Sequence, residues 1–241
     1  MSPSLYIVIP AYNEAANIED VINDWYPVVE AHSGEGKSRL VIVDDGSKDN
    51  TFALMQECAK TRPLFTPRHK KNGGHGATLL YAYRYALENG ADYIFQTDSD
   101  GQTLPSEFQA FWEQKEENDM VIGWRNGRQD GFSRVFVTKV LKYVIRICFG
   151  VSVTDANTPF RLMKRETLER CLRDIPDDFN LSNVIVSVLC AKRGYKVKYI
   201  PITFRPRQGG VNSINLRRIF KIGAKAFSDF LQINRNIKAR Q

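Results

Sequence analysis

Hydrophobic positions along the chain follow two patterns that alternate through its first half. Uninterrupted apolar runs such as 5–9 and 40–43 are typical of strands buried on both faces of a parallel sheet. Between these runs, apolar residues recur every three or four positions, as from Ile18 to Trp25 within 14–31, which is the spacing of one helix face. This alternation predicts an open, mostly parallel α/β sheet with helices on both faces.

The same patterns predict the remaining elements. In the first half we expect a helix ending at Lys60 and capped by 49–51, an edge strand near 63–67, a helix over 76–88, a strand over 93–97, a helix opened by Pro105 and a strand over 120–123. In the second half we expect amphipathic, basic helices over 132–149 and 213–238, a helix over 181–192 and a strand over 196–204. No linker separates the halves 1–125 and 126–241, so we expect a single domain over 1–241.

Charge and composition narrow the possible partners. Among 241 residues, Lys and Arg number 34 and Asp and Glu 27, which gives a net charge of +7 and favours nucleic acid, an anionic membrane or phosphorylated small molecules as partners. Basic residues dominate 125–146 and 205–240. No stretch approaches the roughly 20 apolar residues of a membrane span, and the first residues lack the basic region of a signal peptide. Four cysteines without C-x-x-C spacing predict reduced thiols in a cytoplasmic chain, with neither a zinc site nor a disulfide framework.

Polar clusters follow three of the predicted strands, at 10–14, 44–47 and 98–102. Because the carboxyl ends of parallel strands form one crevice, we expect these clusters to meet there. Asp98 and Asp100 are separated by one residue, so both can reach a hard cation such as Mg²⁺ or Mn²⁺, which prefers oxygen ligands shared with substrate phosphates. Gln102 can add a carbonyl ligand. The sequence therefore predicts a divalent-cation site at the end of a buried strand.

The order and spacing of these motifs resemble those of the family-2 glycosyltransferases with the GT-A fold. The matching stretches are Ile7-Val8-Ile9-Pro10-Ala11-Tyr12-Asn13-Glu14, Val43-Asp44-Asp45-Gly46-Ser47-x-Asp49-x-Thr51, Asn72-x-Gly74-x-Gly76-Ala77 and Asp98-x-Asp100-Gly101-Gln102.

This resemblance implies a nucleotide-sugar pocket. In that pocket, Pro10, Tyr12, Glu14 and either Asp44 or Asp45 would hold the base and ribose of the nucleotide-sugar. Asp98 and Asp100 would hold the metal. We also assign Ser99 to the nucleotide pocket. His75, in a glycine-rich turn before a predicted helix, is interpreted as a bystander.

The second half resembles the dolichol-phosphate mannose synthase branch and its bacterial polyprenyl-phosphate relatives. The matching features are Gly123-x-Arg125, a basic helix containing Arg134, Asp155 ahead of Thr158-Pro159-Phe160-Arg161-Leu162, Pro201-Ile202-x-Phe204-x-Pro206-Arg207, and Gly210-x-Asn212-Ser213. Thr158-Pro159-Phe160 stands where a small residue, Gly and Phe are common in that branch.

Arginines in this half are candidates for binding phosphates, because guanidinium groups match phosphate oxygens in a bidentate manner. Arg125, Arg134, Arg205 and Arg207 are the candidates, with Ser213 added on the acceptor side. The catalytic set is Asp100, Arg125 and Arg134.

Whether a general base is needed depends on the acceptor. A phosphate monoester is largely a dianion near neutral pH and needs none, whereas a sugar hydroxyl does. Asp177 or, preferably, Asp178 is then the candidate base; alternatively, this pair begins a helix.

We therefore expect inverting, metal-dependent transfer of a sugar from a UDP- or GDP-sugar to a polyprenyl or dolichyl phosphate, by a chain at the cytoplasmic face of a membrane. The basic helices could face that membrane, and a membrane-protein partner or a homo-oligomer is compatible with this reading. The alternative acceptor is a hydroxyl of a glycan or lipid-linked saccharide.

Other function classes are less well supported. A nucleotidyltransferase would carry a Gly-rich basic loop after its first strand, which 10–14 is not, and a processive synthase would carry Gln-x-x-Arg-Trp. The acidic crevice opposes a nucleic-acid-binding module.

Overall fold

A single seven-stranded sheet organises the structure, a computed structural model whose description covers residues 2–34, 36–125, 132–205 and 227–235. The side chains of residue 125 and of residues 132–138 lie outside this description. The strands are β1 (Leu5–Ala11), β2 (Arg39–Asp44), β3 (Phe65–His69), β4 (Tyr93–Gln96), β5 (Met120–Arg125), β6 (Arg161–Lys164) and β7 (Val197–Ile202).

The strand order is β3-β2-β1-β4-β6-β5-β7. β1 pairs in parallel with β2 and β4, β2 with β3, and β5 with β7, whereas β6 runs antiparallel to both β4 and β5. The sheet is therefore mixed but mostly parallel, as the hydrophobic pattern predicted.

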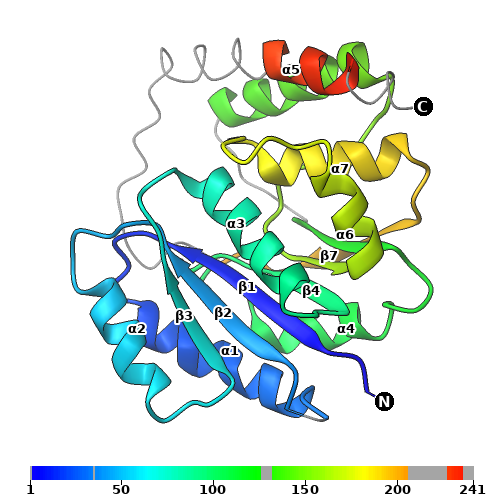
Figure 1. The fold of residues 1–241 in the computed structure, drawn as a ribbon. Coiled ribbons are helices and arrows are strands. Elements are labelled where there is room, and N and C mark those ends of the chain that lie inside the picture. Colours follow the sequence, from blue (N-terminus) through cyan, green and yellow to red (C-terminus); the bar gives the residue numbers. More distant parts are fainter. Residues whose placement is uncertain (1, 35, 126–131, 206–226, 236–241) are drawn as a thin grey trace.

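Helices cover both faces of the sheet (Figure 1). They are α1 (Ile18–Ala31), α2 (Thr51–Ala59), α3 (His75–Glu88), the 3-10 turn η1 (Pro105–Glu107), α4 (Phe108–Trp112), α5 (Phe132–Phe149), α6 (Arg165–Leu172) and α7 (Ser182–Lys192). Residues 227–235 are also helical.

Alternate side chains of each central strand enter opposite cores. Tyr6 and Val8 of β1 pack with α3, α6 and α7, whereas Leu5, Ile7 and Ile9 pack with α1 and α4. Strands buried on both faces in this way read as continuous apolar runs, which is why the sequence located them.

Several predicted boundaries change. The helix expected from Glu14 begins at Ile18 instead, because the amides of Asn17 and Ile18 both donate to the Glu14 carbonyl at 2.9 Å and form a turn first. The predicted edge strand near 63–67 is β3, which lies at the edge of the sheet but spans Phe65–His69.

Two elements, β6 and α6, have no counterpart in the sequence prediction. β6 has a basic residue at each end and only two apolar residues between them, so it shows neither a continuous apolar run nor an alternation. The strand expected over 196–204 is β7, and it ends at Ile202. The long basic helix expected over 213–238 is described only over 227–235; its other residues lie outside the description.

No helix in the described part of the chain is both long enough and apolar enough to cross a membrane.

Candidate active site

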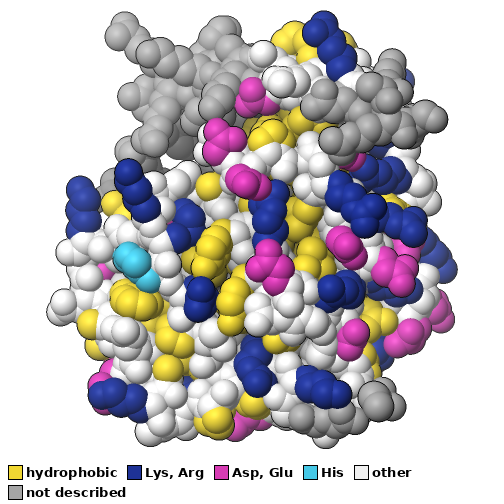
Figure 2. All heavy atoms as spheres, in the orientation of Figure 1, with side chains coloured by type: hydrophobic (Ala, Val, Ile, Leu, Met, Phe, Trp, Pro, Cys, Tyr) yellow, Lys and Arg dark blue, Asp and Glu magenta, His cyan; other side chains and the backbone are white. Residues whose placement is uncertain are grey.

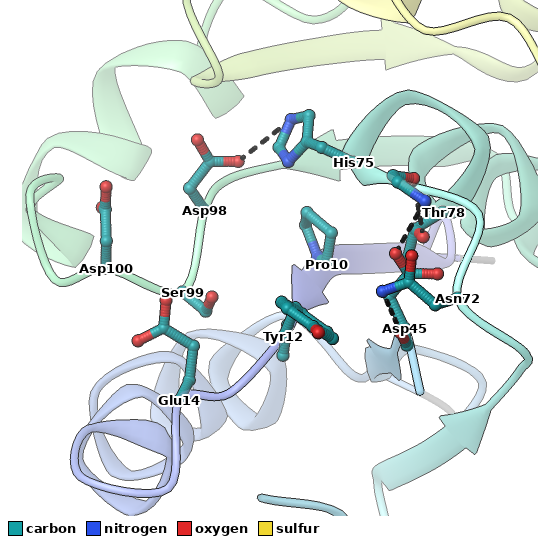
Figure 3. A pocket seen from close by; sticks show the side chains of 12 residues that line it. Pro10, Tyr12, Glu14, Asp45, Asn72, His75, Thr78, Asp98, Ser99 and Asp100 are labelled. Atoms are coloured by element: carbon teal, nitrogen blue, oxygen red, sulfur yellow. Dashed lines mark hydrogen bonds and ion pairs between the residues drawn. The ribbon is translucent and has the colours of Figure 1, made fainter. Parts of the chain in front are cut away.

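A cavity of about 350 Å³ lies where the carboxyl ends of β1, β2 and β4 meet the N-terminus of α3. This is the crevice in which open α/β sheets bind ligands. It is lined by Pro10, Ala11, Tyr12, Glu14, Asp45, Asn72, Gly74, His75, Thr78, Asp98, Ser99 and Asp100. In Figure 3, Asp98, Ser99, Asp100 and Glu14 lie on one side of this cavity, Asp45, Asn72 and Thr78 on the other, and Pro10 and Tyr12 between them.

Asp45 anchors the side of the cavity next to β2. Its Oδ1 accepts from Lys70 Nζ at 2.6 Å and from the Gly73 amide at 2.9 Å, and its Oδ2 accepts from the Gly74 amide at 2.8 Å. Asn72 donates to the Asp45 carbonyl at 2.8 Å. These bonds hold the glycine-rich turn before α3 against the end of β2.

The electrostatic setting of Asp45 keeps it charged. Burial raises the pKa of its carboxyl, but hydrogen bonds from Lys70, Thr78 and the two glycine amides outweigh that effect and place the pKa below its ordinary value. Asp45 is therefore an anionic acceptor on the cavity wall.

Asp44 occupies a different position from its neighbour. Its side chain is fully buried and accepts from Ser47, both from the hydroxyl and from the amide at 3.3 Å. His69 Nδ1 lies 2.7 Å from Asp44 Oδ2. Of the two aspartates offered as alternatives by the sequence, only Asp45 lines the cavity.

The turn after β1 presents Tyr12 and Glu14. Asn13, between them, takes a left-handed φ of 54°, and its amide donates to Ser47 Oγ at 2.9 Å. The Glu14 amide donates to Thr51 Oγ1 at 2.9 Å. These bonds tie the turn to the start of α2 and leave the Tyr12 ring 42% exposed beside the cavity.

The loop after β4 carries the two aspartates of the predicted cation site. It is closed by a hydrogen bond of 2.7 Å between the hydroxyls of Thr97 and Thr103. His75 Nε2 lies 3.8 Å from Asp98 Oδ1, an ion pair when the imidazole is protonated (Figure 3). The backbone amide of Gln102 donates to Asp100 Oδ1 at 3.2 Å.

These residues fit a divalent cation that is shared with a substrate. Among the residues described here, no group of three His, Cys, Asp or Glu side chains is arranged to hold a metal. Mg²⁺ is commonly held by one or two carboxylates, with phosphates and water completing its shell, so Asp98 and Asp100 suffice as protein ligands if a diphosphate supplies the rest.

Gln102, the third predicted metal ligand, faces another segment. Its side-chain Nε2 donates to the backbone carbonyl of Arg205 at 2.8 Å, and its backbone carbonyl accepts from the backbone amide of Arg205 at 2.8 Å. Gln102 thus ties the Asp98–Asp100 loop to the segment after β7, and it is not among the cavity-lining residues.

The acceptor-side candidates are less completely described. Arg125 ends β5 and Arg134 lies in α5, but the side chains of both lie outside the described part of the structure. Arg207 and Ser213 lie outside it altogether. Arg205 is exposed.

The candidate base is not among the residues that line the cavity. Asp178 is exposed and does not line it, and neighbouring Asp177 pairs with Arg84 at 2.7 Å. Neither begins a helix, because α7 starts at Ser182.

Besides Ala11 at the end of β1, four lining residues had no site role in the sequence analysis: Asn72, Gly74, His75 and Thr78. Their signal was the Asn72-x-Gly74-x-Gly76 motif ahead of a helix, a pattern typical of anion-binding turns. His75 in particular faces Asp98, which only the fold could show.

Comparison with known proteins agrees with this geometry. The profile of glycosyl transferase family 2 matches residues 6–172. The chain belongs to this family. All the residues that line the cavity lie within the matched region.

Two curated relatives are similar over most of their length. Polyprenol monophosphomannose synthase of Mycolicibacterium smegmatis is 26% identical over 229 residues, which cover 90% of this chain and 84% of the relative. Undecaprenyl-phosphate mannosyltransferase of Micrococcus luteus is 25% identical over 215 residues, with 86% of each chain covered.

Solved structures show the same GT-A fold. Glucosyl-3-phosphoglycerate synthase from Mycobacterium tuberculosis, in complex with Mg²⁺ and UDP, superposes with a TM-score of 0.68 at 18% identity, covering 96% of this chain and 79% of the other. The complex with Mn²⁺, UDP and phosphoglyceric acid gives a TM-score of 0.67 at 18% identity, with 96% and 78% covered.

Proposed function

We propose that this glycosyltransferase moves a sugar from a UDP- or GDP-sugar to a polyprenyl or dolichyl phosphate, with inversion at the anomeric carbon. The observation that carries this proposal is the cavity. It brings together the carboxylate of Asp45, which can accept hydrogen bonds, and the Asp-x-Asp loop, at the ends of neighbouring strands. The names of the relatives support the acceptor, since they act on polyprenol or undecaprenyl phosphate.

The donor would lie across the cavity from Asp45 to Asp98. Tyr12 offers an exposed ring on which a base can stack, and Asp45 can accept a hydrogen bond from a ring N–H of uracil or guanine. The diphosphate would then lie near Asp98, Ser99 and Asp100.

Asp98 and Asp100 would hold Mg²⁺ or Mn²⁺, which supplies positive charge to the departing diphosphate. His75, 3.8 Å from Asp98, lies at the N-terminus of α3, where backbone amides also favour anions. The chain itself thus orients the leaving group through its carboxylates and this helix terminus.

The acceptor oxygen would attack from the opposite side of the sugar ring. A lipid phosphate arrives already ionised, so no protein base is needed, and Asp178, outside the cavity, is not required. Arg125, Arg134, Arg205, Arg207 and Ser213 remain the proposed phosphate-binding residues.

An amphipathic surface on α5 fits an acceptor that resides in a bilayer. Val140, Tyr143 and Ile147 recur at helical spacing and are 44%, 69% and 73% exposed. Exposed Lys139, Lys142 and Arg146 run beside them in the same spacing.

We call these six residues the α5 face. Figure 2 shows a few hydrophobic and basic side chains at the top of the molecule, where α5 and the helix over 227–235 lie together in Figure 1. Apolar side chains flanked by cations are the pattern of helices that lie on anionic membranes, so we place the enzyme at the cytoplasmic face of a membrane.

A donor and acceptor screen tests the function. UDP-glucose, UDP-N-acetylglucosamine and GDP-mannose would each be offered with Mg²⁺ or Mn²⁺ and either a short-chain polyprenyl phosphate or a simple sugar acceptor. We expect one donor to give a lipid-linked phosphosugar, detected by mass spectrometry, and no product when EDTA is present. Transfer to the sugar hydroxyl alone would contradict the proposed acceptor, and binding of no nucleotide would contradict the proposed donor.

A further inference from the structure

A buried arginine lies behind the Asp98 side of the active site. The side chain of Arg161, the first residue of β6, is fully buried. Its Nε and Nη2 donate to the Thr158 carbonyl at 3.1 and 2.6 Å, and Nη2 also donates to the Ala156 carbonyl at 3.2 Å. Its Nη1 donates to the Asn183 carbonyl at 2.9 Å and to Ser187 Oγ at 3.2 Å.

Keeping this cation buried is costly. All five of these bonds go to neutral oxygens, so the direct partners of the guanidinium offset only part of the cost of removing it from water. Burial lowers the pKa of the guanidinium, although Tyr83, Cys190 and the carboxylate of Asp155 oppose that shift. A core position without a functional demand would be filled more favourably by an apolar residue.

The strand register places the first segment held by Arg161 beside the reacting end of the donor. In the antiparallel pair of β4 and β6, Arg161 lies opposite Gln96. Asp98 follows Gln96 by two residues, so the residues before Arg161 run past the end of β4, where Asp98 lies. Extended along this register, the segment before Arg161 runs beside the loop that carries Asp98, although residues 156–158 are not among those lining the cavity.

The second segment leads to the same place. Asn183 and Ser187 belong to the first turns of α7, and the chain just before α7 packs on the N-terminus of α3. There a Cβ placed on Gly76 would lie 2.3 Å from the Asn180 carbonyl oxygen. Gly76 directly follows His75, which faces Asp98.

We propose that Arg161 is a positioning residue for sugar transfer. By holding both the 156–158 turn and the start of α7, it fixes the wall of the active site around Asp98 and His75, where the sugar leaves the diphosphate. The base end of the cavity, built on β1 and β2, does not depend on Arg161. Arg161 would act in this way whichever acceptor receives the sugar.

Three variants test this role. Arg161→Lys keeps the charge but loses the planar set of donors. Ser187→Ala removes one acceptor of Arg161, together with the bonds that the Ser187 hydroxyl donates to the Ala156 and Asn183 carbonyls at 3.2 and 2.9 Å. Val188→Ala, at a fully buried apolar position of the same helix, is a matched control that lowers stability without touching Arg161. For each variant we would measure the thermal midpoint, the Kd of UDP and GDP by calorimetry with Mn²⁺, and kcat for release of nucleoside diphosphate. That release reports transfer to water as well as to lipid, so it is independent of the proposed acceptor.

We expect Arg161→Lys to lower kcat about 30- to 100-fold and Ser187→Ala about 2- to 5-fold, with nucleotide Kd within about twofold of wild type. Val188→Ala should keep kcat within about twofold at a temperature where all variants are folded. A wild-type kcat in Arg161→Lys, an equal loss in Val188→Ala, or a nucleotide Kd that weakens as much as kcat falls would each overturn the proposal. If Arg161→Lys does not fold, the Ser187→Ala variant is the test. A kcat of Ser187→Ala that is no lower than the kcat of Val188→Ala would then overturn the proposal.

Discussion

The two carboxylate groups at opposite ends of the cavity sit in different electrostatic settings. Asp45 is neutralised by Lys70 at 2.6 Å and by two backbone amides, and its side chain is only 5% exposed. The Asp98 side chain is 25% exposed and faces a histidine at 3.8 Å rather than a lysine. Asp45 is thus held by a lysine and backbone amides in the wall of the cavity, whereas the partner of Asp98 is a histidine whose charge depends on its protonation.

Loss of charge at the Asp-x-Asp loop should abolish catalysis without unfolding the protein. We expect Asp98→Asn and Asp100→Asn each to lower kcat by about 100-fold or more, a typical loss when one transition-state electrostatic contact is removed. Steady-state assays at saturating Mn²⁺, with thermal midpoints alongside, would measure this. Exposed Glu117→Gln serves as the control of equal charge change. Activity of both Asp variants at the control level would contradict the assignment of the cation site.

Asp45→Asn should instead destabilise the fold, in a way that depends on pH. A carboxylate whose folded pKa is lowered adds stability above its unfolded pKa of about 3.9, and that contribution is lost as the pH falls through the folded value. Urea unfolding at pH 7 should show Asp45→Asn less stable than wild type by about 1–3 kcal/mol, and the gap should narrow toward pH 3. A gap that stays constant between the two pH values would show that the charge of Asp45 is not responsible.

Among the elements, α3 connects the nucleotide cavity to the second half of the chain. Its first turn contributes His75 and Thr78 to the cavity, and Gly76 in the same turn packs on the Phe179 and Asn180 carbonyls. Arg84, further along α3, pairs with Asp177. The close approach is possible only because Gly76 has no Cβ.

Gly76→Ala should therefore force α3 and the loop before α7 apart. Its Cβ would meet the Asn180 carbonyl oxygen at 2.3 Å, and we expect a loss of about 1–3 kcal/mol in unfolding free energy, with weaker UDP or GDP binding. Gly34→Ala is the matched control, because its new Cβ meets only the Ser2 side chain, at 2.7 Å, and neither residue lines the cavity. Equal stability of the two variants would show that the loop yields without cost.

At the scale of the whole molecule, the α5 face lies on the outer side of a helix that is docked on the described core. The opposite side of α5 is held by Ile145, Cys148 and Phe149, and the Phe149 ring packs on Phe230 at 5.5 Å. Asn234 also donates to the Cys148 carbonyl at 2.7 Å. The helix is thus docked on the protein through one side, with its apolar and basic stripes turned outward.

Binding to anionic vesicles should depend on both stripes. We expect Lys142→Gln to weaken binding to phosphatidylglycerol vesicles about fivefold, corresponding to about 1 kcal/mol per cation, and Ile147→Ser to weaken it about tenfold. Vesicle co-sedimentation measures both, with exposed Lys196→Gln as the charge-matched control. Turnover of a water-soluble short-chain acceptor should stay at the wild-type level. Unchanged sedimentation of both variants would contradict a membrane role for the α5 face.

Local patterning determined much of this protein. Continuous apolar runs located β1, β2, β4 and β5, because strands buried on both faces require them. Polar residues directly after those runs located the ends of the strands, and the common direction of β1, β2 and β4 brought Tyr12, Asp45 and Asp98 into one crevice as predicted. That 1–241 is a single domain, and that Arg125, Arg134, Arg207 and Ser213 bind phosphate, stay predictions.

Tertiary structure alone decided the features that depend on side-chain direction or on short elements. Asp44 and Asp45 are adjacent on the chain, yet successive residues of an extended backbone point to opposite sides, so one is buried against His69 and the other lines the cavity. β6 shows neither an apolar run nor an alternation, and its antiparallel insertion between β4 and β5 is what places Arg161 opposite Gln96, two residues before Asp98. Likewise, His75 gained a role only when α3 placed it 3.8 Å from Asp98. The sequence by itself thus specified which residues are polar at the strand ends, while packing decided which of them face the ligand.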